Sequence, residues 1–430
     1  MTTGAVVEIL MPRLSDAMED ATILRWLKQP GQQVARGDEL VEVETDKATV
    51  VYEAEDEGVI ESLLVAEGDA VPLGTPIARL VSSSGAPATV GVTAPVAPRE
   101  VAPTTAASVA VVEFREAIRQ ALDEELQRDE RVIFFGEDVA VAGGIFAATT
   151  GLYETYGAAR VFDTPISELA MSGAAYGAAV CGLRPVIEIM FADFLPLIMD
   201  SLLNQATKYH FLDGQRGAPL VIRSSPGAGA RFGAIHSQMP VAWFNGIPGL
   251  KIAAPATPAD AKGLLISAIR DENPVLFLEH KRLYSVKGPL SAGPVPLGVA
   301  AVVRSGTDLT IVTAMKGVHD ALAAATVLQN EHGISVEVID LRTLRPLDTA
   351  TILHSVERTT RLLVVEEGPS SGGFSADVLA RVAEDGLGFL DDAWRLTTSD
   401  SPIPYSPPLE DAFLPSEAAI VASVARRLGR

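Results

Sequence analysis

The sequence predicts a multidomain chain in which a small all-β domain precedes two larger α/β domains. Three observations lead to this prediction: a duplicated glycine-and-valine pattern near the N-terminus, a charge-poor segment after it, and alternating strands and helices over the remainder. The chain has 430 residues, too many for one average domain, and 48% of them are hydrophobic, enough for large buried cores.

The all-β domain is expected over residues 4–82. It contains an internal repeat, whose two copies are Gly31-x-x-Val34-x-x-Gly37 and Gly68-x-x-Val71-x-x-Gly74. An apolar pair, Leu40-Val41 or Ile77-Ala78, follows each copy. A duplicated unit of this length predicts two similar small sheets that pack on each other.

Within that domain, Lys47 lies in the polar run Glu44-Thr45-Asp46-Lys47-Ala48-Thr49. Period-two alternation on both sides, at residues 41–44 and 50–53, predicts a β-hairpin with Lys47 at its tip. A lone lysine at a hairpin tip is usually only a solvated surface residue. The repeat around it favours another interpretation, in which a small domain presents this one side chain.

Composition defines the linker and excludes several functions. Residues 83–107 are rich in Ala, Pro, Val and Thr with almost no charge, which predicts an extended, mobile linker. The net charge of −21, without a basic stripe, argues against nucleic-acid binding and against anionic membrane surfaces. The single cysteine, Cys181, excludes an internal disulfide, and its apolar neighbours predict a buried thiol. No run reads as a signal peptide or a spanning helix, so we expect a cytoplasmic protein.

The two α/β domains are expected over residues 108–290 and 297–425. Apolar side chains at helical spacing predict a first helix that buries Phe114, Ala117, Ile118, Ala121, Leu122 and Leu126. Apolar strands are expected at residues 132–135, 185–190, 219–222, 251–254 and 275–278, and in the second domain at 309–313, 336–339 and 362–365. Helices are expected at residues 169–180, 260–270 and 318–330. Such alternation predicts mainly parallel sheets, with the domain boundary in the polar segment 287–296.

Chemistry in such folds gathers at the carboxyl ends of the parallel strands. Glu137 directly follows the strand at residues 132–135. Glu168 follows Ser167, a predicted N-cap, and therefore lies in the first turn of a helix. A glycine-rich loop at residues 227–238 contains His236 and matches neither the phosphate-loop nor the dinucleotide fingerprint. Each feature alone is weak, since helix-start glutamates and glycine loops are common.

The N-terminal segment resembles a lipoyl domain of the 2-oxo acid dehydrogenase complexes. The matching residues are Met11-Pro12-x-Leu14-Ser15, Trp26-Leu27, Gly31, Gly37-Asp38, Glu44-Thr45-Asp46-Lys47-Ala48 and Glu57-Gly58. Biotin-carrier domains share the fold but flank their lysine with methionines, so Asp46 and Ala48 favour lipoate. The resemblance implies a flattened barrel-sandwich in which Lys47 carries lipoate in amide linkage.

Residues from about 109 to 430 resemble the beta subunit of the thiamine-diphosphate-dependent decarboxylase component of those complexes. The resemblance rests on Asp123-Glu124-Glu125-Leu126, Gly136-Glu137-Asp138, Asp163-Thr164-Pro165-Ile166-Ser167-Glu168, Gly182-Leu183-Arg184-Pro185, Phe191-Ala192-Asp193-Phe194, His236-Ser237-Gln238, Pro248-Gly249-Leu250-Lys251, Asp340-Leu341-Arg342-Thr343-Leu344-Arg345-Pro346-Leu347-Asp348 and Pro402-x-Pro404-Tyr405. It implies a pyrimidine-binding thiamine domain followed by a transketolase C-terminal domain.

The resemblance also implies roles for individual residues. Glu168 hydrogen-bonds the aminopyrimidine ring of thiamine diphosphate, and His236 faces the reacting carbon and the entering dithiolane. Phe194 packs on the pyrimidine. The remaining pocket residues are Glu137, Ile166 and Met190. Some relatives hold a monovalent cation, potassium, through backbone oxygens, which correspond here to Leu220, Ala268, Ile269, Asp271 and Asn273.

The chain contains no Gly-Asp-Gly segment, with which thiamine enzymes bind magnesium and the diphosphate. We therefore expect an alpha subunit to supply magnesium binding and to form an α2β2 heterotetramer. Further expected partners are the dihydrolipoyl acyltransferase core, dihydrolipoyl dehydrogenase and a small 2-oxo acid substrate.

Several alternatives stay open. Acetoin and branched-chain 2-oxo acid dehydrogenases contain similar beta subunits, and the motif at residues 340–348 favours the pyruvate or acetoin members. A dihydrolipoyl acyltransferase needs His-x-x-x-Asp-Gly, but His210-Phe211-Leu212-Asp213-Gly214 is one residue short. A non-catalytic lipoyl carrier does not need the residues of the second domain, and a self-sufficient transketolase-like enzyme needs the missing magnesium motif.

Overall fold

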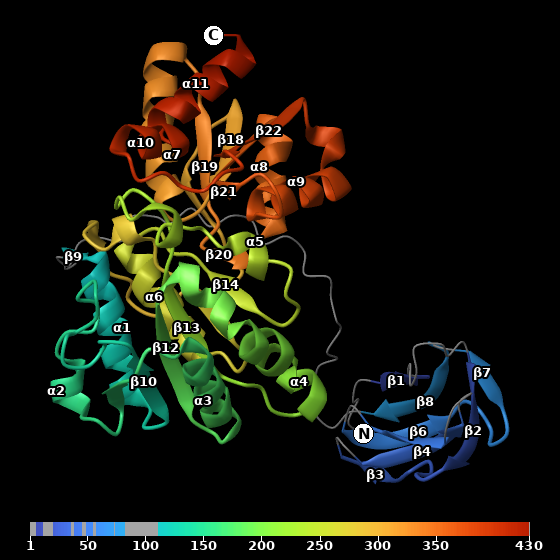
Figure 1. The fold of residues 1–430 in the computed structure, drawn as a ribbon. Helices are drawn as coiled ribbons and strands as arrows, with labels where there is room; N and C mark the ends of the chain where they lie inside the picture. The colour runs from blue at the N-terminus through green and yellow to red at the C-terminus, as the bar shows by residue number, and fades with distance from the viewer. Residues whose placement is uncertain are drawn as a thin grey trace. The chain divides into compact units, whose positions relative to one another are not determined.

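The computed structural model describes residues 6–11, 20–35, 38–44, 49–54, 57–72, 74–81 and 111–429. The chain forms two compact units, Met1–Val96 and Ala97–Arg430 (Figure 1). Within the described ranges, no helix combines the length and apolarity that crossing a bilayer requires.

The N-terminal unit is a sandwich of two four-stranded antiparallel sheets, as the repeat predicted. One sheet has the order β1 (Val6–Leu10), β8 (Pro76–Val81), β6 (Gly58–Leu63), β3 (Gln33–Val34). The other has the order β5 (Thr49–Glu53), β4 (Glu39–Glu44), β2 (Asp20–Trp26), β7 (Ala70–Pro72). Side chains of both sheets form one core, which includes Ile23, Leu40, Ile60, Ile77 and Leu80.

The two repeat copies have the same local structure. Gly31 and Gly68 both adopt positive φ, at +89° and +95°, and the valines three residues later, Val34 and Val71, are both buried. Glycine is favoured at such turns because it has no Cβ to clash. Strands β4 and β5 pair antiparallel with Glu44 opposite Thr49, which confirms the predicted hairpin. Its tip, with Lys47, and the linker at residues 83–107 lie outside the described residues.

The second unit begins with a seven-stranded sheet. Its order is β11 (Val161–Asp163), β10 (Val132–Gly136), β12 (Arg184–Phe191), β13 (Val221–Ser225), β15 (Val275–Leu278), β14 (Lys251–Ala253), β20 (Thr343–Arg345). All neighbours pair in parallel except β14 and β20, which are antiparallel. The helices of this part are α1 (Phe114–Arg128), α2 (Leu152–Tyr156), α3 (Glu168–Val180), α4 (Thr207–Asp213), α5 (Val241–Phe244) and α6 (Pro258–Arg270). The predicted apolar face of α1 is buried, and α1 packs on α6.

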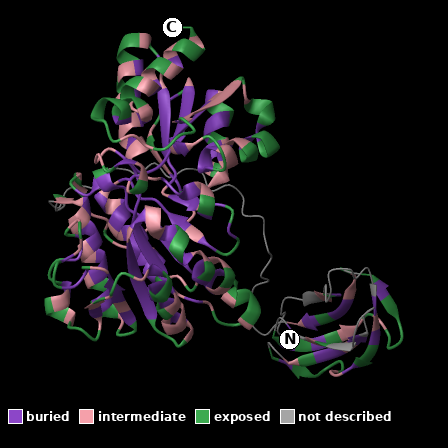
Figure 2. Cartoon of the chain, viewed as in Figure 1, coloured by how far each residue is buried: buried purple, intermediate pink, exposed green. Residues whose placement is uncertain are grey.

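A five-stranded sheet follows, with the order β17 (Ala301–Arg304), β19 (Val336–Asp340), β18 (Leu309–Thr313), β21 (Arg361–Pro369), β22 (Asp392–Thr398). The helices of this part are α7 (Lys316–His332), α8 (Thr349–Thr359), α9 (Phe374–Asp385), α10 (Pro407–Phe413) and α11 (Glu417–Leu428). Alternate residues of β21 enter two cores: Leu363 packs with α7 and α11, whereas Leu362 packs with α8 and α9. Figure 2 accordingly shows buried central strands in both sheets beneath partly exposed helices.

The two sheets are joined by β20, which belongs to the C-terminal part of the sequence but lies beside β14 (Figure 1). Ile252 lies opposite Arg345, and the amide of Ala254 donates to the carbonyl oxygen of Arg342 over 2.8 Å. The strand before α1, β9 (Val111–Glu113), pairs antiparallel with β16 (Lys287–Pro289). The two α/β parts therefore form one continuous structure.

The prediction of a buried Cys181 is wrong, because this thiol is exposed. The apolar stretch around it contains the end of α3 rather than its middle. Cys181 is the C-cap, and Gly182 turns the chain with φ +98°. The side chain therefore lies at a surface turn where the helical apolar face has already ended.

Candidate active site

The sequence-predicted site residues follow four neighbouring parallel strands at one edge of the seven-stranded sheet. Glu137 follows β10, the segment with Ile166 and Glu168 follows β11, Phe194 follows β12, and the loop with His236 follows β13. Met190 is the penultimate residue of β12. Because the carboxyl ends of parallel strands meet at the same edge, the sheet brings these residues to one region.

Two carboxyl groups interact in this region. Glu168 is 9% exposed in the first turn of α3, where the helix dipole favours a negative charge. Burial, together with the charges of Glu168 and Asp138, raises the pKa of Glu137. Ser167 occupies the N-cap position as predicted, but its hydroxyl donates to the carbonyl oxygen of Pro165 instead of capping the helix. Glu168 is thus a buried acid beside a second acid that resists ionisation.

An aromatic cluster holds the imidazole of His236. Its ring lies edge-to-face with Phe191, at 4.8 Å between centroids, and with Phe194, at 5.5 Å. The two phenylalanines are themselves perpendicular, at 6.2 Å. Phe194 lies in the 3-10 turn Ala192–Ile198 directly after β12. The cluster brings together His236 and Phe194, two residues separated by 42 positions in the sequence.

A buried lysine contacts this cluster. The Nζ atom of Lys281 is 5.4 Å from the centroid of the Phe191 ring and donates to the carbonyl oxygen of Gly227 over 3.2 Å. Burial lowers the pKa of Lys281 to about 8, although the charges of Asp193 and Glu367 oppose the effect. Sequence reasoning did not identify Lys281 as part of this region, because the interacting residues come from four separate segments.

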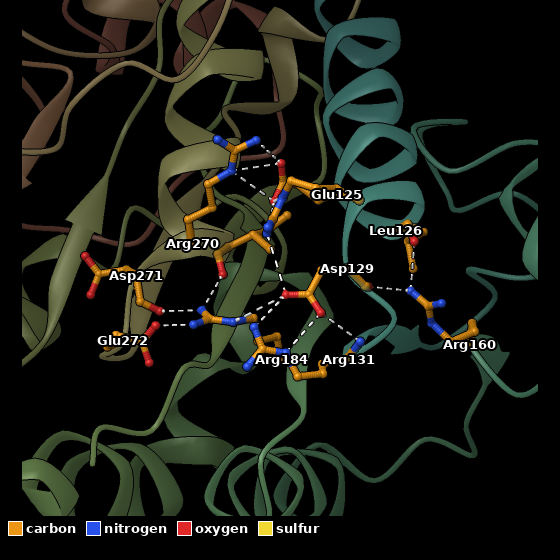
Figure 3. Close-up of polar contacts among 11 residues, drawn as sticks. Glu125, Leu126, Asp129, Arg131, Arg160, Arg184, Arg270, Asp271 and Glu272 are labelled. Carbon is orange, nitrogen blue, oxygen red and sulfur yellow. Dashed lines mark hydrogen bonds and ion pairs between the residues drawn. The ribbon is translucent and has the colours of Figure 1, made fainter. Parts of the chain in front are cut away.

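The five residues expected to hold a monovalent cation lie near the start of β13 and the end of α6. The guanidinium of Arg184 donates to the carbonyl oxygens of Ile269, over 3.0 Å, and Asp271, over 3.1 Å (Figure 3). The carbonyl oxygen of Leu220 accepts from the amide of Val275 over 2.9 Å. Among the described residues, no group of three or more His, Cys, Asp or Glu side chains is placed to hold a metal ion.

Several hydrophobic side chains in the segments that follow these four strands are exposed. Ile166 is 82% exposed, Val141 74%, Ile235 61% and Leu169 57%. Ile166 therefore does not line a closed pocket in this chain. Exposed apolar side chains of this kind can form part of a surface that another protein covers.

Three family models match the chain. They are "Biotin-requiring enzyme" over residues 7–80, "Transketolase, pyrimidine binding domain" over 110–287 and "Transketolase, C-terminal domain" over 298–420. A solved split-gene transketolase, described as an inactive beta4 tetramer, superposes with a TM-score of 0.61 and 22% identity. It covers 73% of this chain and 97% of its own, which supports the fold.

Two curated relatives extend the comparison. The chain is 41% identical to the pyruvate dehydrogenase E1 component subunit beta of Rhizobium meliloti, over 97% of this chain and 98% of that protein. It is 45% identical to the acetoin:2,6-dichlorophenolindophenol oxidoreductase subunit beta of Cupriavidus necator, over 73% of this chain and 96% of the relative. The chain therefore belongs to the family of 2-oxo acid dehydrogenase E1 beta subunits, which includes those of pyruvate dehydrogenase, and carries a domain of the biotin/lipoyl type before its two transketolase-type domains.

Proposed function

We propose that this chain is the beta subunit of a pyruvate dehydrogenase decarboxylase component, with its own lipoyl carrier domain. It acts in oxidative decarboxylation of pyruvate and in reductive acetylation of lipoyl groups. The observation that carries the proposal is that buried Glu168 lies near enough to Glu137 to raise its pKa, at the sheet edge that also holds Phe194 and His236. The similarity to pyruvate dehydrogenase subunits over nearly the whole chain supports it.

The described residues fit the pyrimidine half of thiamine diphosphate. A ring nitrogen of an aminopyrimidine needs a carboxyl partner shielded from water, and the buried Glu168 meets that need. Phe194 offers an aromatic surface for the ring, Met190 lies at the end of β12 and Glu137 directly follows β10. Bound thiamine diphosphate supplies the electron sink that retains the electron pair when a 2-oxo acid loses carbon dioxide.

Glu168 and His236 then have separate tasks. Glu168 forms the hydrogen bond to the pyrimidine ring. His236, kept in orientation by Phe191 and Phe194, donates or accepts a proton at the reacting end, where the dithiolane enters.

An alpha subunit completes the site in this proposal. The sequence lacks a Gly-Asp-Gly segment, so magnesium and the diphosphate are bound by the partner. The exposed side chains of Val141, Ile166, Leu169 and Ile235 provide the surface that the partner covers in an α2β2 heterotetramer. The exposure of Ile166 is consistent with a pocket residue whose pocket closes only in the assembly.

The carrier domain extends the proposal. Strands β4 and β5 form the hairpin that would present Lys47 for lipoylation, and Lys47 lies outside the described residues. The lipoyl group connects the site to a dihydrolipoyl acyltransferase core and to dihydrolipoyl dehydrogenase. The proposal also includes a potassium ion near the backbone oxygens of Leu220, Ala268, Ile269, Asp271 and Asn273. Two of these oxygens, those of Ile269 and Asp271, also accept hydrogen bonds from Arg184.

An acetoin dehydrogenase beta subunit is the second candidate, since the acetoin relative shares 45% identity with this chain. Steady-state kinetics of the chain with its alpha subunit would separate the two. We expect the highest kcat/KM with pyruvate, compared with acetoin and 3-methyl-2-oxobutanoate. A preference for acetoin of more than about tenfold would replace the first proposal with the second.

The lipoyl assignment has an independent test. Intact mass after co-expression with a lipoate ligase should show the lipoyl adduct, and Lys47→Arg should abolish it. A wild-type chain that stays unmodified, while the same ligase modifies another lipoyl domain, would exclude the assignment.

A further inference from the structure

The loop at residues 227–238, here called the His236 loop, is attached to the C-terminal domain by backbone hydrogen bonds to two carboxylates. The amide of Ala228 donates to Oε1 of Glu367 over 2.6 Å. The next amide, that of Gly229, donates to Oε1 of Glu410 over 3.0 Å. Glu367 lies on β21 and Glu410 on α10, so both come from beyond the seven-stranded sheet that carries the loop.

Glu367 has a second donor, which fixes its orientation. Its Oε2 lies 2.9 Å from Nε2 of His280, whose ring is buried. The Nδ1 atom of His280 accepts from the amide of Arg282 over 3.1 Å, so Nε2 carries the proton and donates to Glu367. Each carboxylate oxygen of Glu367 therefore accepts from a different donor. A glutamine cannot replace it, because its NH₂ end would face either Ala228 or His280 donor-to-donor.

Glu410 is likewise paired on both oxygens. Its Oε2 lies 2.5 Å from a guanidinium nitrogen of Arg231, a residue of the His236 loop, and Asp411 pairs with the same guanidinium at 2.8 Å. Glu410 is fully buried, whereas the side chain of Arg231 is 37% exposed. A buried carboxylate with these donors is strongly oriented.

Packing holds the loop at its glycines but leaves one flank open. A Cβ at Gly227 would lie 2.3 Å from the His280 ring, and one at Gly233 would lie 2.2 Å from the ring of Tyr405. In contrast, Ala234 and Gln238, on either side of His236, line a cavity of about 470 Å³ between the loop and the C-terminal domain. The hydrogen bonds to the two glutamates attach the loop to the C-terminal domain. Next to His236, the amide of Gln238 donates to Oδ1 of Asp193 over 3.1 Å, which attaches the end of the loop to the segment after β12.

We propose that Glu367 and Glu410 are positioning residues for His236, acting through the backbone of the loop that carries it. The catalytic part of this inference rests on the proposed function, in which His236 serves the lipoyl-dependent step. The loop attachment itself does not depend on that function. The C-terminal domain thus takes part in the reaction without contacting the substrate.

Amide hydrogen exchange of the full chain tests the attachment. Glu367→Gln should speed exchange of the Ala228 amide, and Glu410→Gln that of the Gly229 amide, each by about 10- to 100-fold. The matched control is Glu337→Gln, because Glu337 is as buried as Glu410 and pairs with Arg358 at 2.5 Å within the C-terminal domain. Exchange in the loop should not change in this control. Unchanged exchange in both test variants would overturn the inference.

A second variant covers the case in which a buried Glu→Gln change prevents folding. Arg231→Asn removes the partly exposed guanidinium that orients Glu410, and asparagine tolerates the φ of +65° at this position. It should also speed exchange of the Gly229 amide. If exchange stays at the wild-type rate, Glu410 does not hold the loop.

Activity of the reconstituted complex tests the positioning. Glu367→Gln and Glu410→Gln should lower lipoamide-dependent kcat about tenfold, with KM for the 2-oxo acid and the rate with an artificial electron acceptor within about twofold of wild type. Equal loss in both assays, or in neither, would overturn the positioning role. If the wild-type complex is inactive on every 2-oxo acid while the exchange effects persist, the proposed function fails and the attachment stands.

Discussion

Asp340 gives the sharpest test of how the two α/β domains are joined. It ends β19, is fully buried, and accepts from the amide of Arg342 over 2.9 Å through one oxygen. Asp260 of α6, also buried, forms an ion pair with Arg342 at 2.9 Å. Burial, together with the charge of Asp260, raises the pKa of Asp340 to about 7 against the opposing effect of Arg342. The folded protein thus keeps a proton at Asp340 that the unfolded chain releases.

The sign and size of the effect follow from this difference. The unfolded pKa of aspartate is 3.8, so between about pH 4 and pH 7 the folded state binds one proton more than the unfolded state. Stability attributable to Asp340 is therefore present below pH 4 and is lost as the pH rises to about 7. The difference spans about three pH units at about 1.4 kcal/mol each, which sets an upper limit of about 4 kcal/mol.

Asp340→Asn removes the titration while keeping the shape of the side chain. We expect the free energy of unfolding, from urea titrations between about pH 4.5 and pH 7.5, to fall less steeply with pH in the variant than in wild type. Asp391→Asn, a change at an exposed aspartate, is the control and should keep the wild-type slope. Equal slopes for Asp340→Asn and wild type, or a steeper slope in the variant, would refute the reasoning.

Three further predictions follow from the same structure. Glu168→Gln should leave folding intact but lower activity of the reconstituted complex by about 100-fold and slow hydrogen–deuterium exchange at C2 of the cofactor. If exchange stays at the wild-type rate, Glu168 only stabilises the start of its helix. Arg223→Met leaves two buried glutamates without their guanidinium and should cost about 3–5 kcal/mol in urea unfolding, so a loss below about 1 kcal/mol would contradict the buried network. Gly249→Ala should destabilise more than Gly151→Ala by about 2 kcal/mol, because both have φ near +84° but only the Cβ at Gly249 would meet a backbone atom, the Thr207 oxygen at 2.4 Å; equal losses would contradict it.

Local patterns in the sequence predicted most of the architecture. The helical spacing of α1, the apolar runs of β10, β15 and β18, and the duplicated glycine motif each depend on residues close together in the chain. Strand β20 was missed because it has three residues and gains its partner, β14, from another domain. Cys181 was misjudged because apolar neighbours do not reveal where a helix ends.

Local sequence patterns identified some residues of the candidate site and missed others. Glu137, Glu168 and His236 were identifiable because each follows a predicted strand or lies in a recognisable motif. Glu367 and Glu410 were not, since each lies more than a hundred residues from the amide that it binds. No local pattern encodes such a contact, and only the packing of β21 and α10 beside the loop reveals it.

The position of β20 also constrains how this protein is synthesised. Until residues 343–345 leave the ribosome, β14 has an unpaired edge, which can form hydrogen bonds with a strand of another nascent chain. Roughly 90 residues separate the two strands, so at about 5–20 residues per second the edge stays open for roughly 5 to 18 seconds. The same arrangement limits domain exchange between relatives, because a transplanted C-terminal domain brings with it the strand that completes the recipient's sheet.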